Sequence, residues 1–482
     1  MRLKMITAAV CLTIGSTLPL NTTLANEHDA LRQQVDALEQ QLNELRRQLE
    51  QAHPTTVAAP DTTAAQPAHA QHRPRVDGDG VRPLRVGTVA AGNAFNPAIS
   101  VILDGFYYNG KDGFMDAIEH ATGFTNPHDH GDHDHGELSN GFNLGHTELT
   151  FTATVDPYFD AMLALGIGEH SIEIEEAWMQ TRNLPGGLRL KGGKFLSGIG
   201  YLNSQHAHDW DFADMALPYQ LIFGDHGLNE TGLQLTWTPP TSIYTHFGVE
   251  LLQGSNGGMA NYEGARDYAH GRGARDMNGP RLTTAFAKFG PDLGHDHALQ
   301  IGLFGGQSRL HQNLHGSRGE EGRAWFAGTD WVYRYDRGGA AGHGTLKLQG
   351  EYIYRVRDLS VVGSRDNDAS HPLGQSRKEV QDAFYLQGVY GIAPRWTAGL
   401  RYERAGMTNR LGDRYPNATP AETDRITANL TWSPTEFSRL RLQAAQARVA
   451  HGDAGRAGQR ERFNQFFLQY QMALGVHGAH GF

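Results

Sequence analysis

Histidine and aspartate alternate in residues 126–137, which read NPHDHGDHDHGE. Imidazole and carboxylate groups without sulfur suit zinc, copper or nickel more than calcium. Glycine and the alternate spacing predict a loop, so we expect weak, exchangeable metal binding rather than a closed structural site. A polar, solvent-exposed loop of biased composition is the alternative interpretation. The candidate metal ligands are His128, Asp129, His130, Asp132, His133, Asp134 and His135.

A second segment, residues 198–227, combines histidine and aspartate with aromatic and apolar side chains. It contains Tyr201, Trp210 and Phe212, more aromatic residues than a freely solvated loop should carry, which favours packing against a wall. Its polar groups could line a narrow passage in which carboxylates attract divalent cations and imidazoles bind them transiently. Equally, they could hydrogen-bond to the wall and only fix the loop. The candidate constriction residues are His206, His208, Asp209, Asp211, Asp214, Asp225 and His226.

The elements that would position these groups have a hydrophobic period of two between residues 96 and 482. In the segment GHTELTFTATV, Leu149 and Phe151 alternate with Glu148 and Thr150. One face of such a strand suits lipid and the other suits water. The same alternation recurs in SIEIEEAWMQ, GLQLTWT, GTLKLQGEYIY, RITANLTW and SRLRLQA. The pattern predicts an all-β transmembrane barrel.

We count about sixteen antiparallel strands, and the connections between them alternate in length. The short connections are DPY, NLPGG, TPPTS, GIAPR and SPTEFS. The long ones are residues 110–140, 198–229, 254–279 and 358–381. Short turns on one side and long loops on the other are typical of an outer-membrane barrel. In general porins the loop after the fifth strand folds into the lumen, so we expect residues 198–229 to form the constriction.

Three segments precede the predicted barrel, which we place at residues 93–482. Residues 1–25 combine a basic start, an apolar run and small residues at the end, which predicts a secretory signal peptide. Residues 27–52 carry a heptad seam, which predicts a short periplasmic coiled-coil helix that needs partner helices, as in a homotrimer. A solitary amphipathic helix is the alternative. Residues 53–92 are rich in alanine, proline and threonine, which predicts a flexible linker.

Composition agrees with an exported barrel. Hydrophobic residues make up 39% of the 482 residues, a modest share that suits strands with one apolar face and a wet lumen. The only cysteine, Cys11, lies in the predicted signal, so we expect neither a disulfide nor a thiolate metal site. The net charge of -10 gives no indication of nucleic-acid binding.

Catalytic motifs are absent from the sequence. It contains no nucleophile elbow, no phosphate-binding glycine loop and no His-Glu-x-x-His pattern, so we expect no enzyme. We also expect no required cofactor, with Zn²⁺ as a transported or loop-bound ion.

Alternation along the strands also assigns charged side chains to the lumen. These are Glu173 and Glu175 on one strand, Lys347 on another, and Arg439 and Arg441 near the end. Gln349 and Glu351 share the parity of Lys347. Rows of opposite charge leave the ion selectivity open, and the arginines show too little clustering in the sequence for a phosphate-binding ladder.

Three segments resemble a known family. They are NPAISVILDGFY at residues 96–107, LKGGKFLSGIGYLNSQHAHDWDF at 190–212, and residues 477–482. They are similar to porin-like outer-membrane proteins associated with zinc uptake, some of which are labelled TonB-dependent receptors. The coil-plus-barrel plan is also similar to that of phosphate-selective porins. The C-terminal Phe482 resembles the signal that the barrel assembly machinery recognises.

The receptor label fits this chain poorly, because such receptors need a globular plug before a barrel of about 22 strands. The expected function is therefore passive passage of a small hydrophilic solute, zinc or another divalent metal, across the Gram-negative outer membrane. Two alternatives remain open: a general or anion-selective porin with incidental histidines, and a metal-binding surface or receptor barrel. The expected partners are outer-membrane lipid, the assembly machinery, two sister chains and peptidoglycan, which the coil could contact.

Overall fold

The structure is a computed structural model that describes residues 97–111, 114, 139–169, 171–366, 372–410, 422–450 and 460–475. The chain divides into two compact units, Met1–His72 and Arg73–Phe482, and all the described residues belong to the second. The predicted signal peptide, coiled coil and linker, and the predicted metal ligands of residues 128–135, lie outside the described residues. Within the described ranges, no helix has the length and apolar character needed to cross a membrane.

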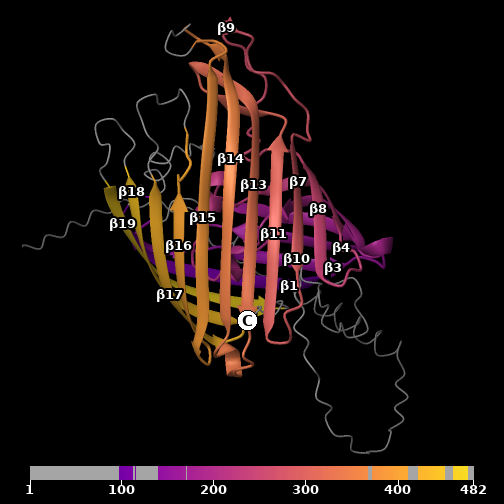
Figure 1. Ribbon diagram of the computed structural model, residues 1–482, viewed down its shortest axis with the longest axis vertical. Helices are drawn as coiled ribbons and strands as arrows, with labels where there is room; N and C mark the ends of the chain where they lie inside the picture. The colour runs from indigo at the N-terminus through magenta and orange to yellow at the C-terminus, as the bar shows by residue number, and fades with distance from the viewer. Residues whose placement is uncertain are drawn as a thin grey trace, which may run out of the picture. The chain divides into compact units, whose positions relative to one another are not determined.

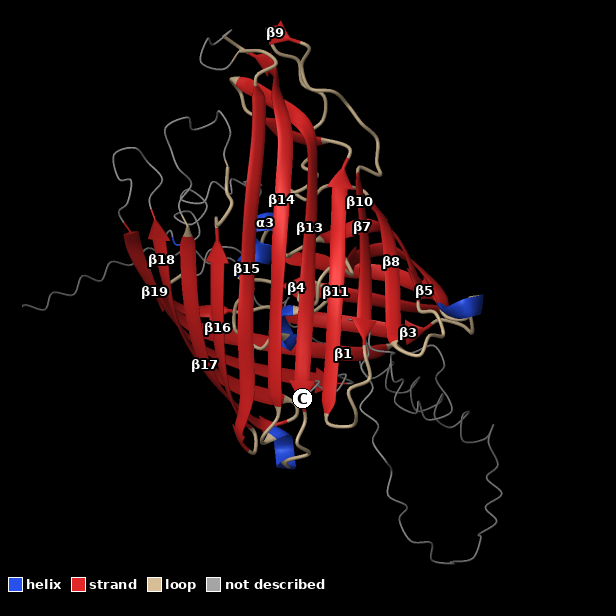
Figure 2. Ribbon diagram, in the orientation of Figure 1, coloured by secondary structure: helices blue, strands red, loops and turns tan. Residues whose placement is uncertain are grey.

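The described strands form a closed antiparallel barrel, because the first strand pairs with the last. Strand β1 (Ala98–Gly110) pairs with β19 (Arg460–Gly475) along one edge and with β2 and β3 along the other. The strands between them are β2 (Gly141–Leu144), β3 (Thr147–Thr154), β4 (Phe159–Ile167), β5 (Ile172–Thr181), β6 (Leu188–Leu196), β7 (Asn229–Trp237), β8 (Tyr244–Leu252), β9 (His270–Gly271), β10 (Leu282–Gly290), β11 (His297–Ser308), β12 (His311–Leu314), β13 (Arg318–Tyr335), β14 (Leu346–Ser364), β15 (Ser376–Ala393), β16 (Trp396–Ala405), β17 (Thr423–Thr435) and β18 (Ser438–Ala450). Figures 1 and 2 show the barrel wall.

Eighteen of the nineteen described strands form the sixteen strand positions of this wall. Strands β2 and β3 both pair with β1 and share one position in the wall. Strands β11 and β12 both pair with β13 and share another. Strand β9 pairs only with the end of β14 among the described strands, outside the ring. The prediction of about sixteen antiparallel strands is confirmed, and closure leaves no unpaired sheet edge to face lipid.

The short connections and two of the long ones are confirmed, and residues 112–113 and 115–138 of the first long connection lie outside the described residues. Residues 198–228 fall between β6 and β7, which begins at the last residue of the predicted connection, Asn229. Residues 254–279 fall between β8 and β10 with β9 inside them. The prediction of a long loop at 358–381 was wrong, since β14 and β15 remain paired as far as Ser360 and Ser376. Figure 1 shows these strands rising beyond their neighbours. Cross-strand partners such as Arg357 and Glu379 replace hydrophobic alternation there, which hid the strands in the sequence.

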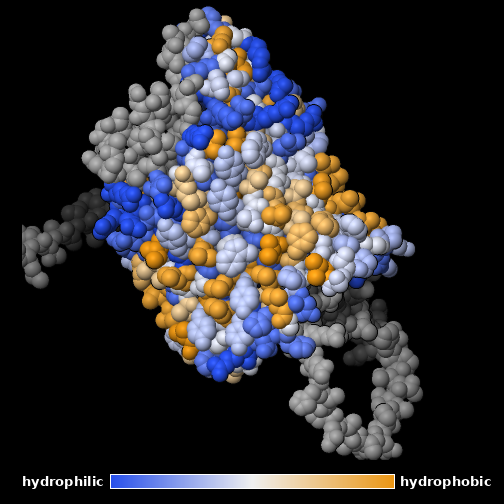
Figure 3. All heavy atoms as spheres, viewed as in Figure 1, coloured by the Kyte–Doolittle hydropathy of each residue, from blue (hydrophilic) through white to orange (hydrophobic). Residues whose placement is uncertain are grey.

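Apolar side chains face outward and polar side chains face inward. On β18, Leu440 and Leu442 are exposed, whereas Arg441 and Gln443 are each 1% exposed. Figure 3 shows hydrophobic residues gathered over the middle and lower part of the barrel, between hydrophilic zones. This arrangement is the reverse of a soluble protein and is that of a porin-like barrel of the outer-membrane type.

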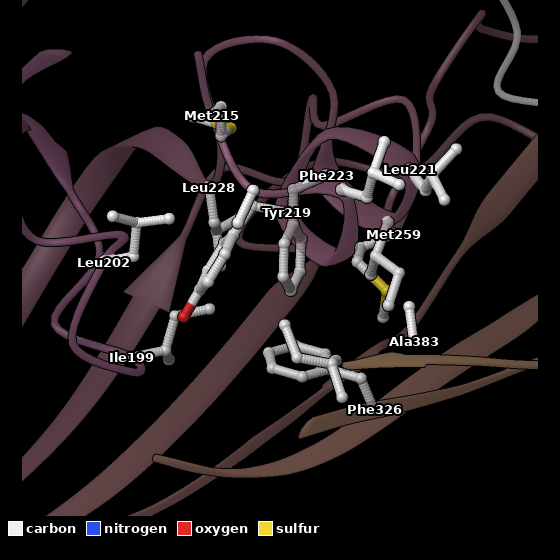
Figure 4. Close-up of a cluster of buried hydrophobic side chains, with 14 of the residues drawn as sticks. Ile199, Leu202, Met215, Tyr219, Leu221, Phe223, Leu228, Met259, Phe326 and Ala383 are labelled. Carbon is white, nitrogen blue, oxygen red and sulfur yellow. The ribbon is translucent and has the colours of Figure 1, made fainter. Parts of the chain in front are cut away.

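The segment between β6 and β7 folds into the barrel and ends in the short helix α3 (Leu217–Phe223), which Figure 2 shows behind the front wall. Its apolar side chains pack against the inner wall, as the aromatic content of this segment predicted. Phe223 meets Phe326 of β13 edge to face, with 5.1 Å between ring centroids. Figure 4 shows this cluster, which includes Ile199, Leu202, Tyr219, Leu221, Phe223, Met259, Phe326 and Ala383. This apolar cluster, which we call the dry core, therefore fills part of the lumen. We call residues 197–228 the inner loop.

Candidate metal-binding site in the barrel lumen

An irregularity in β5 turns two successive glutamates toward the lumen. On the neighbouring strand β4, Ala164 pairs with Glu176 and Leu165 pairs with Ile174, so Glu175 is an extra residue in the ladder. Such a bulge breaks the alternation of side chains and re-aims them. Both glutamates reach the imidazole of His206 on the inner loop, at 3.5 Å from Glu175 and 2.7 Å from Glu176.

Four side chains from three parts of the chain converge beside this bulge. His146 comes from the link between β2 and β3, Glu148 from β3, Glu175 from β5 and His206 from the inner loop. One candidate ligand atom from each lies within 4.8 Å of the other three. The closest contacts are His146 Nε2 to Glu175 Oε1 and His206 Nδ1 to Glu148 Oε2, both 2.9 Å. We call these four residues the lumen cluster.

The donor set of the lumen cluster fits a zinc ion. Two imidazoles and two carboxylates without sulfur are ligands that Zn²⁺ takes in a four-coordinate site. Glu148 Oε2 is buried, and no described residue donates a well-directed hydrogen bond to it. Two histidine nitrogens nevertheless lie close, Nδ1 of His206 at 2.9 Å and Nδ1 of His208 at 3.3 Å. A buried carboxylate oxygen without a good donor is suited to binding a cation.

The electrostatic field at the inner loop favours positive charge. Burial alone would lower the pKa of His206, but the facing carboxylates, Glu148 first, raise it well above its ordinary value. The His208 ring stacks on the His206 ring with 5.6 Å between centroids. A metal ion at this position would take the place of a proton that the same carboxylates stabilise.

The structure separates the predicted constriction residues into two groups. His206 and His208 face the acidic wall of β3 and β5. Asp211 and Asp214 instead pair with wall cations, Asp211 with Lys347 Nζ at 2.9 Å and Asp214 with Arg401 and Arg425 at 2.8 Å each. These ion pairs fix the loop to the wall.

Of the remaining predicted residues, Asp209 lies in the middle of the inner loop, and Asp225 and His226 lie near its C-terminal end. Asp209 lies 3.8 Å from His208 Nε2, and Asp225 accepts a hydrogen bond from Gln220. Burial lowers the pKa of His226, which favours its neutral form. Solute binding by these seven residues stays a prediction.

Comparison with known proteins identifies one relative. No family model matches the chain. An uncharacterized protein of Aquifex aeolicus is 33% identical over 398 residues, which span 81% of this chain and 80% of that protein. This chain belongs to the same family as the Aquifex protein. Because that relative is uncharacterized, the resemblance to zinc-uptake porins stays a prediction.

Several solved outer-membrane proteins show a weaker, structural similarity. In-vitro folded OmpT of Vibrio cholerae is 10% identical, covers 80% of this chain and 100% of its own, and has a TM-score of 0.44. The channel DcaP of Acinetobacter baumannii is 13% identical, covers 79% of this chain and 96% of its own, and has a TM-score of 0.47. The outer-membrane protein opdK of Pseudomonas aeruginosa is 14% identical, covers 79% of this chain and 99% of its own, and has a TM-score of 0.37. These similarities are too weak to carry an argument, so the assignment of a barrel rests on the strand pairing within this chain.

Sequence reasoning placed Glu148 and Glu175 on the polar faces of their strands but did not join them into one site, and it gave His146 no role. Glu176 was missed, because strict alternation turns it toward lipid. The adjacent glutamates in EIEEAW were the available signal, since two polar residues in succession interrupt the pattern of a lipid-facing strand.

Three buried arginines that are far apart in the sequence come from neighbouring strands of the barrel wall. Arg401 of β16, Arg425 of β17 and Arg441 of β18 are each 1% exposed and lie on three neighbouring strands. They are 24 and 16 residues apart in sequence. Arg401 and Arg425 meet at Asp214, whereas Arg441 lies opposite Thr431 and donates to the backbone carbonyl of Trp210. Arg401 and Arg425 neutralise Asp214, so this wall holds the inner loop. The lumen thus has an acidic arc at β3–β5 and a basic arc at β16–β18.

Proposed function

We propose that this protein is an outer-membrane channel for a divalent transition-metal ion, with zinc as the preferred solute. The observation that carries the proposal is the lumen cluster, in which two wall carboxylates and two imidazoles converge within 4.8 Å. In this proposal, a metal ion passes between the wall and the inner loop, the two parts of the barrel that supply the four ligands.

The ligand types explain why zinc would be preferred. Ca²⁺ and Mg²⁺ take oxygen ligands almost exclusively, whereas two of the four ligands here are imidazole nitrogens. A transported ion must also leave, so the site must not bind too tightly. Because one ligand, His206, comes from a loop rather than from the wall, a small displacement of that loop would open the site.

The histidine-rich residues 126–137 supply the first step in this proposal. They would collect metal and raise its concentration before it reaches the lumen cluster. Passage would then be passive. The same proposal includes a location in a Gram-negative outer membrane, with residues 27–52 as a periplasmic coil that joins three chains.

Single-channel recording in planar bilayers tests the proposed function. We expect cation-selective current, measured by the reversal potential in asymmetric salt, that micromolar zinc reduces. His146→Ala and His206→Ala should conduct but require roughly tenfold more zinc for the same effect, because each removes one ligand. His297→Ala, which removes an exposed histidine at the start of β11, is the matched control.

The outcomes separate the alternatives. Current that zinc does not change in the unaltered protein would indicate a general porin and contradict the proposal. Zinc sensitivity that survives both lumen substitutions would place the site elsewhere. Zinc binding without any current would indicate a surface receptor.

A further inference from the structure

We propose that Glu176 is a positioning residue that selects the metal-binding tautomer of His206, with the proton on Nε2 and the lone pair on Nδ1. The inference rests on the proposed metal site and assigns a role to a residue outside the four ligands. It predicts which nitrogen of His206 holds the ion.

One carboxylate oxygen of Glu176 is hydrogen-bonded to the barrel wall. Its Oε2 accepts hydrogen bonds from the Trp178 indole Nε1 at 3.0 Å and from the backbone N–H of Leu196 at 3.2 Å. Glu176 as a whole is 7% exposed, so its side chain has little freedom to rotate. Its Oε1 is left to meet His206 Nε2 at 2.7 Å. An ionised carboxylate only accepts, so this contact requires a proton on Nε2.

The other nitrogen of His206 faces the ligand side. Its Nδ1 lies 2.9 Å from Glu148 and 3.5 Å from Glu175, the two carboxylates of the lumen cluster. A histidine that binds a metal through one nitrogen commonly donates its other N–H to a carboxylate, which fixes the tautomer and the ring orientation. Glu176 occupies that outer position.

The bulge in β5 allows one strand to supply both a metal ligand, Glu175, and the residue that positions His206, Glu176. With regular alternation, only one of Glu175 and Glu176 could face the lumen. The extra residue lets Glu175 join the lumen cluster while Glu176 holds His206 from the opposite side of the ring. The bulge is thus a means of placing a ligand and its support on adjacent residues.

Glu176→Gln gives a sharp test because the amide is not symmetric. Two donors, from Trp178 and Leu196, point at the Oε2 position, so the amide oxygen must turn there. The amide NH₂ then faces His206 Nε2 and donates to it, which forces the ring proton onto Nδ1. That proton blocks the nitrogen that would bind the metal. The substitution changes almost no volume, so the barrel should fold.

The affinity for zinc is the first readout, measured on the full-length refolded protein in detergent by competition with a chromophoric chelator. We expect Glu176→Gln to raise the Kd by about 10–100-fold, the usual effect of removing such a partner. Glu173→Gln is the matched control, because it removes the same charge from the same strand without touching the Glu176–His206 hydrogen bond. We expect it to change the Kd on the order of twofold, because Glu173 is not one of the four ligands and contributes only its charge.

The second readout is the anomalous diffraction signal of zinc in soaked crystals, which a purely structural role of Glu176 would not predict. In the unaltered protein we expect zinc bound to His206 Nδ1. Zinc bound to Nε2 or to Glu176 itself would overturn the inference, and so would a Glu176→Gln variant with unchanged affinity. If the unaltered protein binds no zinc, the lumen site fails together with this inference, a result distinct from the preceding ones.

Discussion

Replacing Asp214 should release the inner loop from the barrel wall. The Asp214 carboxylate lies 2.8 Å from both Arg401 and Arg425, and Gln443 donates to it at 2.6 Å. Both arginine side chains are 2% exposed. In Asp214→Asn the amide cannot neutralise them, and Glu403 is the carboxylate that remains in contact with both arginines among the described residues.

The size of the effect follows from this burial. Removing one partner of a buried ion pair costs about 3–5 kcal/mol, and we expect the lower end because Glu403 still compensates one charge. A cost of about 3 kcal/mol shifts the docking equilibrium of the loop roughly 100-fold. The strands should not unfold, since their backbone pairing does not involve Asp214.

Limited proteolysis of the folded protein, with cleavage sites mapped by mass spectrometry, measures loop release. We expect residues 197–228 of Asp214→Asn to be cleaved faster, and the single-channel conductance to rise or fluctuate. Asp211→Asn is the control: its pair with Lys347 is 22% exposed on both sides and should contribute about 1 kcal/mol or less. Equal protection of both variants would refute the assignment of Asp214 as the main anchor.

Two further predictions concern the dry core and the outer histidines. Phe223→Ala should destabilise the docked loop by about 3–5 kcal/mol, because Phe223 is 4% exposed and packs on Phe326; the protease assay above measures it, and an unchanged cleavage rate would contradict it. Replacing the four histidines of residues 128–135 by alanine should weaken zinc capture, measured by equilibrium dialysis, and leave the heat-resistant folded band on gels unchanged, because loop tips contribute little to barrel stability.

The sequence was sufficient for the barrel and for the inner loop. Alternation of apolar and polar residues, as in Leu440 and Arg441, depends only on neighbours along one strand, so it can be recognised without knowledge of pairing. The aromatic residues of the inner loop likewise predicted that this loop packs against the barrel wall. Both signals are local.

The metal site and the arginine wall could not be predicted in the same way. They depend on which strands are adjacent and in which register, and a one-residue shift turns a side chain to the other face. The bulge at Glu175 is such a shift, and it decides that Glu176 faces His206 rather than lipid. Likewise, Glu351 accepts hydrogen bonds from Tyr219, Tyr385 and the backbone of the inner loop, contacts that join distant parts of the sequence.

The two walls act on the inner loop in different ways, and this difference bears on metal affinity. The arginines of β16 and β17 hold Asp214, and the dry core holds α3, so these parts of the loop are ordered without a metal ion. His206 is therefore presented to the acidic arc in a fixed position, and metal binding need not include the entropy of ordering the loop. It follows that an anchor such as Asp214, whose ion pairs are with Arg401 and Arg425 rather than with the four ligands, should still influence zinc affinity. Glu176 acts on the orientation of the same histidine, whereas Asp214 acts on where its backbone lies.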